Sequence, residues 1–178
     1  MAFQTPRYAP SRRALHWAIA ALMVLSYVFI LGRENFERGS DARLAMVQTH
    51  FWIGLVILAL MLPRLLLLFS RPAPAVQPLL PAWQAVPAKA VHLLLYAMLV
   101  AQPVLGLLTA WTDGKELLVP FTQIVVPALL SPNEGLAHQF EDLHELIGTA
   151  FYWVVGLHVA AALYHHFVRR DDTLRRMT

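Results

Sequence analysis

Long apolar stretches separated by short polar segments dominate this chain. Three of the four stretches carry no charged side chain, and the second carries only Arg64. A helix needs roughly 20 mostly apolar residues to cross the ~30 Å hydrocarbon core of a bilayer, and only a helix satisfies its own backbone polar groups there. The pattern predicts an all-α integral membrane protein in which residues 1–178 form a single four-helix transmembrane bundle. The predicted spans are 14–31, 50–69, 90–111 and 146–168.

Composition supports this interpretation. Hydrophobic residues make up 58% of the chain and charged residues only 14%, against about 25% charged in soluble domains. Four buried helices of a soluble protein are therefore a poor alternative, because too little polar chain is left to cover them. The absence of cysteine excludes disulfides, iron–sulfur clusters, Cys-ligated zinc and covalent c-type haem.

The distribution of Lys and Arg predicts the orientation in the membrane. If the N-terminus lies inside, ten of these residues lie on the inner side and four on the outer side. This bias predicts cytoplasmic N- and C-termini and a multi-pass protein of the bacterial inner (cytoplasmic) membrane. Arg12 and Arg13 resemble a twin-arginine signal, but three further spans follow, so we interpret them as a cytoplasmic anchor. The net charge is +3, but the placement of the charges is more informative than their sum, and we expect no nucleic-acid partner.

Two connecting segments are distinctive. Residues 71–87 contain five prolines and are expected to run extended along the inner surface. Residues 112–142 form the largest extramembrane piece, which is expected to lie outside and to include a short surface helix.

Histidines supply the candidate chemistry. His144 and His158 are 14 residues apart, which places both rings on one helix face at a separation of roughly 21 Å along the axis. In an antiparallel bundle, His50 matches the depth of His144 near the outer surface. His16 matches the depth of His158 on the inner half.

Two imidazoles at one depth can clamp a flat macrocycle and give a haem iron two axial His ligands. Without C-x-x-C-H, such a haem is b-type and non-covalent. The pattern therefore predicts two haem b groups, one for each pair. His92 and His165 also lie on the inner half, so they are alternative partners in the inner pair. Zinc would need ligands that converge on one point, and a proton relay would need acids within the spans. Any single histidine could instead hydrogen-bond a neighbouring helix.

Several short motifs carry a resemblance to a known family. They are Leu15-His16-Trp17, Ser40-Asp41-x-Arg43, His92-Leu93-x-x-Tyr96, Pro103-Val104-x-Gly106, His144-Glu145, Gly156-Leu157-His158-x-Ala160-Ala161-Ala162-Leu163-x-His165-His166 and Asp172-Thr173-Leu174-x-Arg176-Met177. Across nearly its whole length the chain resembles the bacterial cytochrome b(561) family, and within it the superoxide oxidases.

The resemblance implies a function and a set of sites. Such cytochromes pass electrons from superoxide to ubiquinone, and the family's haem ligands fall on His16, His50, His144 and His158. His165 falls on a position that the family associates with the quinone. Related members serve as cytochrome b subunits of hydrogenases and dehydrogenases, so a redox protein partner is the main alternative. A non-redox transporter or metal carrier is a further alternative.

Further candidates lie at the two membrane surfaces. Arg43, seven residues before His50, is the leading candidate for steering superoxide, together with Arg33, Arg38 and Lys115. At the inner end, His165, Lys89 and His92 are candidate donors to a quinone carbonyl or proton sources, because histidine titrates near neutral pH. The ordinary alternatives are a solvated charged loop outside and interfacial side chains inside.

Overall fold

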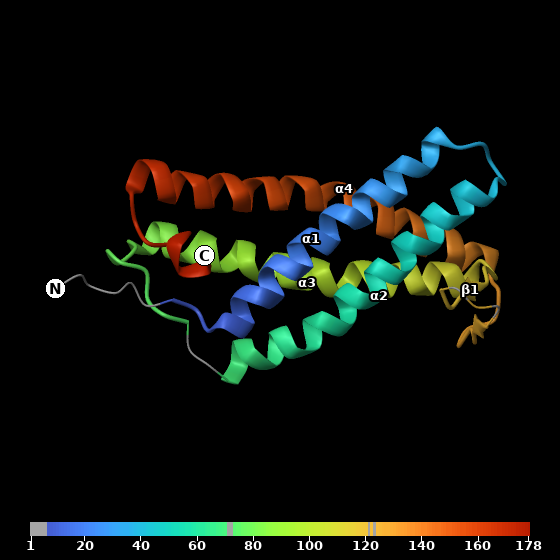
Figure 1. Ribbon diagram of the computed structural model, residues 1–178, viewed down its shortest axis with the longest axis horizontal. Coiled ribbons are helices and arrows are strands. Elements are labelled where there is room, and N and C mark those ends of the chain that lie inside the picture. Colours follow the sequence, from blue (N-terminus) through green and yellow to red (C-terminus); the bar gives the residue numbers. More distant parts are fainter. Residues whose placement is uncertain (1–6, 71–72, 121, 123) are drawn as a thin grey trace.

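Four antiparallel helices make up most of the structure, a computed structural model that describes residues 7–70, 73–120, 122 and 124–178 (Figure 1). All four are long and apolar enough to cross a membrane, so the predicted four-helix transmembrane bundle is confirmed. The first three helices extend beyond their predicted spans at both ends, and the fourth begins before its span and ends within it. The helices are α1 (Pro10–Gly32), α2 (Asp41–Ser70), α3 (Ala82–Thr112) and α4 (Glu134–Tyr164).

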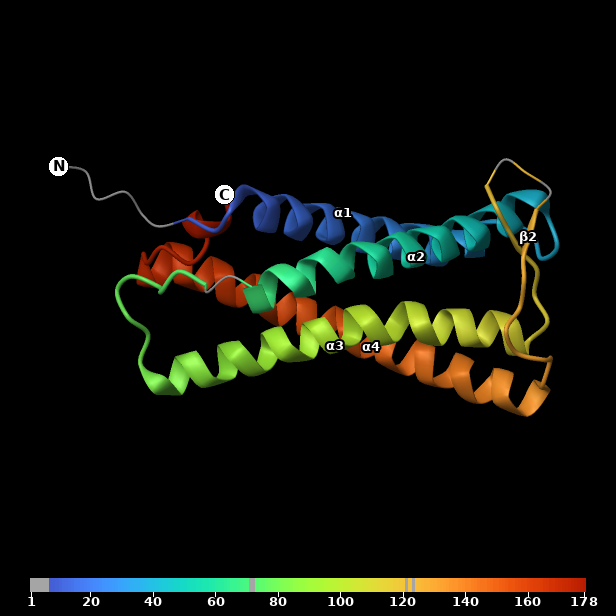
Figure 2. The same cartoon turned by 90° about the horizontal axis from the view of Figure 1, so that it is seen from below.

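The helices pack as two pairs. Figure 2 shows α1 with α2 on one side and α3 with α4 on the other, and α2 packs on α3 to join the pairs. The Tyr27 hydroxyl of α1 donates to the Gly148 carbonyl of α4 at 2.9 Å, which ties the first helix to the last. The start of α1, the C-terminus and the described part of the α2–α3 connection lie at one end of the bundle. The α1–α2 connection and the two short strands lie at the other end.

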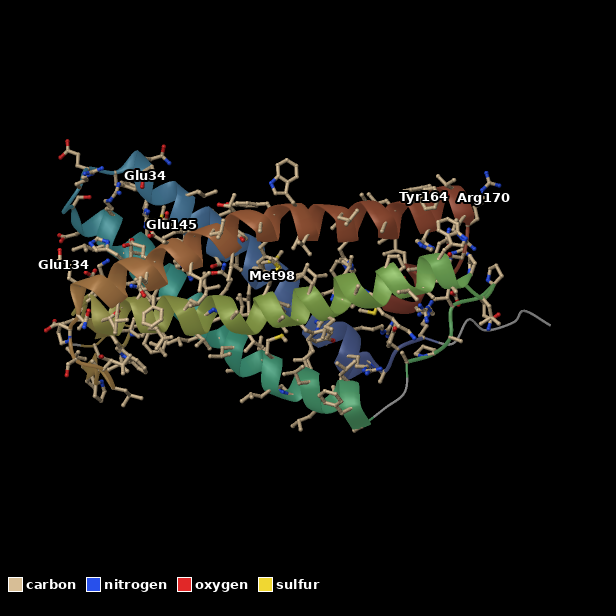
Figure 3. All side chains as sticks on the ribbon, turned by 180° about the vertical axis from the view of Figure 1, so that it is seen from behind. Glu34, Met98, Glu134, Glu145, Tyr164 and Arg170 are labelled. Carbon is tan, nitrogen blue, oxygen red and sulfur yellow. The ribbon has the colours of Figure 1, made fainter. Side chains whose placement is uncertain are left out.

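The bundle has a narrow apolar centre and an apolar outside. Ile19, Ile57 and Met61 form a buried cluster, with Tyr96 and Leu99 packed against it. Figure 3 shows Met98 midway along the molecule, Glu34, Glu134 and Glu145 towards one end, and Tyr164 and Arg170 at the other. Large apolar side chains face outwards, with exposed fractions of 84% for Phe69, 78% for Trp153 and 70% for Leu66. Exposure of many large apolar side chains is typical of a surface that contacts lipid.

The structure corrects the prediction for residues 112–142. Among the described residues of this segment, β1 (Leu117–Leu118) pairs antiparallel with β2 (Val125–Val126), and no separate surface helix is present. The helical residues from Glu134 onwards are the first turns of α4, which Asn133 caps by accepting a hydrogen bond from the Leu136 amide. The β-branched Val125 and Val126 favour a strand, and the cap determines where the helix begins.

The structure also shortens the predicted extended segment 71–87. Residues 71–72 lie outside the described residues, and α3 begins at Ala82, so residues 82–87 are helical. Pro81 precedes the helix with extended backbone, and Pro87 lies inside the helix. Alanines at 82, 85 and 88 favour helix strongly enough to offset the hydrogen bond that Pro87 cannot donate.

The chain reverses direction after α4. A π-helical turn, η2 (His165–Arg169), follows α4, and Arg170 adopts left-handed backbone with φ of 56°. The following residues fold back on the bundle. The Asp172 carboxylate accepts a hydrogen bond from the backbone N–H of Gln77, and the Trp17 indole donates to the Met177 carbonyl. Residues 171–178 therefore connect α1, the α2–α3 connection and α4 at one end of the bundle.

Candidate functional site

The outer histidine pair joins α2 and α4. The ring centroids of His50 and His144 are 6.2 Å apart and their planes meet at 89°. His50 Nδ1 lies 3.0 Å from the Ser26 carbonyl oxygen and 2.9 Å from the Ser26 hydroxyl. His144 Nδ1 lies 3.0 Å from the Gln102 carbonyl oxygen. Because a carbonyl can only accept, each ring is favoured to carry its proton on Nδ1, which leaves Nε2 free to bind a metal.

A glycine makes room for the outer pair. A Cβ atom at Gly106 would lie 3.2 Å from His144 Cε1, which is closer than an ordinary contact. Gly106 therefore lets the His144 ring pack directly against the α3 backbone. The Gln102 side-chain amide donates to the His144 carbonyl at 2.9 Å and fixes the two helices at this level.

The inner histidine pair joins α1 and α4. The ring centroids of His16 and His158 are 6.3 Å apart, with an interplanar angle of 74°. His92 on α3 also approaches His158, at a centroid distance of 5.3 Å. The buried Ile19, Ile57 and Met61 lie on helix segments between the two histidine levels.

The spacing of the two pairs fits a shared metal. A metal–imidazole bond of about 2.0 Å, with the ring centre about 1.1–1.2 Å behind the nitrogen, places two opposed axial imidazoles about 6.3 Å apart between centroids. Both His50–His144 and His16–His158 match this spacing. His92–His158 is about 1 Å too short, so the geometry favours His16 over His92 as the partner of His158. The residues present therefore fit two bis-histidine haems.

Arg64 lies beside the inner pair and was not predicted as a functional residue. Its Nη2 lies 3.0 Å from His16 Nδ1, and its Nε donates to the Tyr96 hydroxyl at 3.3 Å. Tyr96 also lies under the guanidinium, 5.4 Å from ring centroid to Cζ. The signal that could have identified this residue was present in the sequence, because Arg64 is the lone charge within the four apolar stretches.

His165 forms a separate site at the end of α4. Its Nδ1 lies 2.5 Å from Asp171 Oδ2, and Arg169 Nε lies 3.5 Å from the same oxygen. The Asp171 carboxylate is fully buried. Burial acts to raise the pKa of Asp171, but hydrogen bonds from His165 and Thr173 outweigh it, so the pKa lies below its ordinary value. Asp171 was also missed from the sequence, because its contact with His165 depends on the reversal at Arg170.

The other predicted residues lie at opposite ends of the bundle. Lys89 is exposed near the start of α3, one helical turn before His92. Arg43 Nη2 lies 3.0 Å from Glu34 Oε1, and its Nη1 donates to the carbonyls of Arg33 and Phe36. These contacts hold the α1–α2 connection together, and they leave the Arg43 side chain 18% exposed.

Side chains that can bind a metal do not form larger clusters in the described part of the chain. Within residues 7–70, 73–120, 122 and 124–178, no group of three or more His, Asp or Glu side chains is placed to hold a metal ion. A zinc site built from protein side chains needs three or four such ligands, whereas a haem iron needs two from the protein.

Comparisons with known proteins agree with this chemistry. The model of the prokaryotic cytochrome b561 family matches residues 7–178. "Cytochrome b561 homolog 1" of Escherichia coli K12 is 30% identical over 171 residues, covering 96% of each chain. "Probable superoxide oxidase CybB" of Yersinia pestis is 29% identical, over 96% of this chain and 95% of its own. "Cytochrome b562" of Cereibacter sphaeroides is 29% identical, over 98% of this chain and 96% of its own.

Proposed function

Because this chain belongs to the prokaryotic cytochrome b561 family, a family of membrane electron-transfer cytochromes that bind haem b, we propose that it is a di-haem superoxide:ubiquinone oxidoreductase. His50 and His144 hold the outer haem b, and His16 and His158 hold the inner one. The observation that carries this proposal is the pair of centroid spacings, 6.2 and 6.3 Å, at two levels of one bundle.

The four histidines bind and orient the cofactors. Haem b, when bound, takes up one electron at a time and passes it on. The carbonyls of Ser26 and Gln102 keep the outer imidazoles in the tautomer that coordinates through Nε2. The apolar cluster between the two levels keeps water out of the middle of the bundle.

The substrate of the outer end is proposed to be superoxide, a small anion. Arg33, Arg38 and Lys115 lie in the connections at that end and Arg43 lies in the first turn of α2, and their local positive field is proposed to steer superoxide amid the acids of the same end. Arg43 also positions the loop, since its guanidinium joins Glu34 to two backbone carbonyls. The likeness to a probable superoxide oxidase supports this donor.

The acceptor at the inner end is proposed to be ubiquinone. Two superoxide ions give up one electron each and leave as oxygen, and one ubiquinone takes up both electrons and two protons. His165 supplies a proton from its ring, which Asp171 holds in one orientation. His92, adjacent to His158, and Lys89, one turn earlier on α3, are placed to donate to a quinone carbonyl.

The proposed orientation places both termini in the cytoplasm of a bacterium. The start of α1, the C-terminus and the described part of the α2–α3 connection share one end of the bundle, and the sequence assigns ten of the fourteen Lys and Arg residues to that side of the membrane. Superoxide therefore meets the protein on the periplasmic side, and the quinone meets it on the cytoplasmic side.

A superoxide pulse tests this function directly. The purified protein in vesicles with ubiquinone, and with no protein partner added, is expected to convert ubiquinone to ubiquinol at one molecule for every two superoxide ions consumed. Vesicles without the protein give the background rate. A protein that binds haem but is inert to superoxide would overturn the proposal and favour the alternative, an electron-transfer subunit that needs a dehydrogenase partner.

A further inference from the structure

Arg64 is a half-buried cation that lacks a countercharge. Its Nη1 is buried without a hydrogen-bond partner, and no carboxylate in the described part of the chain forms an ion pair with it. The residue lies in the half of α2 that faces the inner histidine pair. A charge at membrane depth is costly unless it is paired. Arg64 therefore needs an anion that the polypeptide does not supply.

The contact between Arg64 and His16 points to the nature of that anion. An imidazole that binds iron through Nε2 carries a hydrogen on Nδ1 and needs an acceptor there. A guanidinium only donates. Two donors therefore face each other when His16 is a ligand, and the 3.0 Å contact between Arg64 Nη2 and His16 Nδ1 must give way.

The outer pair provides the contrast. His50 Nδ1 faces the Ser26 carbonyl and His144 Nδ1 faces the Gln102 carbonyl, so both rings already have the acceptor that a ligand requires. Among these three rings, His16 alone faces a cation. The difference indicates that the group bound at the inner level carries its own acceptor for Arg64.

We propose that Arg64 binds a propionate carboxylate of the inner haem, with Tyr96 holding the guanidinium in place. This inference rests on the proposed two-haem function. A planar guanidinium matches a carboxylate through two parallel hydrogen bonds and neutralises its charge, whereas the neutral carbonyl of a quinone does not. The Tyr96 hydroxyl accepts a hydrogen bond from Arg64 Nε, and the Tyr96 ring lies beneath the guanidinium. The two terminal nitrogens of Arg64 are left to bind the carboxylate.

A positive charge beside the inner cofactor also favours its reduced form. Removal of that charge leaves the propionate uncompensated and lowers the reduction potential of the inner haem. The outer haem, about 21 Å away along the bundle, is nearly unaffected. Arg64 therefore raises the potential of the inner haem, and this shift favours transfer from the outer to the inner level.

Redox titration of single-haem variants tests this inference. Arg64→Gln and the charge-retaining Arg64→Lys are placed in a His144→Ala background, which keeps the inner haem, and in a His158→Ala background, which keeps the outer one. Arg64→Gln is expected to lower the midpoint potential in the first background and leave it unchanged in the second, while Arg64→Lys stays near the parent. Loss of the inner haem from Arg64→Gln but not from Arg64→Lys would also support binding of a propionate by Arg64.

Infrared difference spectroscopy supplies a second readout. With haem labelled with ¹³C at the propionates, the carboxylate bands of the inner haem are expected to shift in Arg64→Gln. Unchanged potential and unchanged bands in a variant that keeps its haem would overturn the inference, as would a defect confined to the KM for ubiquinone. Failure of the His144→Ala background to retain one haem would instead overturn the two-haem function, so the two failures are distinguishable.

Discussion

His50 and His144 lie close together in the half of the bundle next to the α1–α2 connection, with ring centroids 6.2 Å apart and planes at 89°. Their Nδ1 atoms lie within hydrogen-bond distance of carbonyls on α1 and α3. Four helices therefore define one site, although only two of them supply imidazoles. The same arrangement of opposed rings recurs at the inner level, so the bundle repeats one type of site twice along its length.

Loss of either outer ligand is expected to remove one haem and keep the other. His50→Ala and His144→Ala should each contain one haem b per chain, because the inner pair lies about 21 Å away and is held by different residues. Superoxide-driven ubiquinol formation should fall to background. His138→Ala, which changes an exposed histidine at the start of α4, serves as the control and should retain two. Two haems in either ligand variant would refute the assignment.

A methyl group at Gly106 is expected to loosen the outer site. The new Cβ atom would lie 3.2 Å from His144 Cε1 and displace the ring by a few tenths of an ångström. We expect the affinity for the outer haem to fall about 10–100-fold, the usual effect of disturbing a group that orients a ligand. Haem content after dilution in detergent measures the effect. Gly156→Ala, where no atom lies within 4 Å of the added carbon, should behave as wild type.

Asp171 is expected to act on the quinone through His165. Asp171→Asn should keep both haems but slow ubiquinone reduction about tenfold or more, the equivalent of one charge-assisted hydrogen bond of ~1.5–3 kcal/mol. The wild-type protein should keep its rate as the pH falls through the usual range of an aspartate, because the pKa of Asp171 lies below its ordinary value, whereas the variant should lack the loss of rate at still lower pH. Asp172→Asn, which changes the neighbouring acid that accepts from the Gln77 amide, is the matched control. A tenfold loss with an unmoved pH profile would assign Asp171 a purely structural role.

Arg43 is expected to affect the encounter with superoxide. In Arg43→Gln the second-order rate of superoxide consumption should fall, and its dependence on ionic strength should become weaker, because one positive charge is lost from the outer end. Stopped-flow measurements at several salt concentrations provide the test. If Arg43 serves only to hold the loop through Glu34 and the backbone carbonyls, the rate will fall while its salt dependence stays the same.

The sequence predicts the four spans and the histidine pairing for simple geometric reasons. Apolar length locates the helices, and the 3.6-residue turn places His144 and His158 on one face. The acceptors for His50 and His144 escape prediction because they are backbone carbonyls, which carry no residue signature. Asp171 escapes because its contact with His165 depends on the left-handed turn at Arg170.

The corrections in the connecting segments have a similar origin. The expected surface helix within 112–142 is wrong because strand pairing between Leu117–Leu118 and Val125–Val126 is a non-local contact. The expected extended run to residue 87 is wrong because the alanines at the start of α3 favour a helix more strongly than Pro87 disfavours it. Local periodicity determines long apolar helices well, but it does not determine how short polar segments pair or fold back.

The number of haem b groups per chain is the most direct test of the account. A pyridine haemochrome assay of the purified protein, with protein determined by amino-acid analysis, should give two haems per chain. A value of one, or a colourless protein, would contradict the two-level arrangement of histidines as cofactor sites.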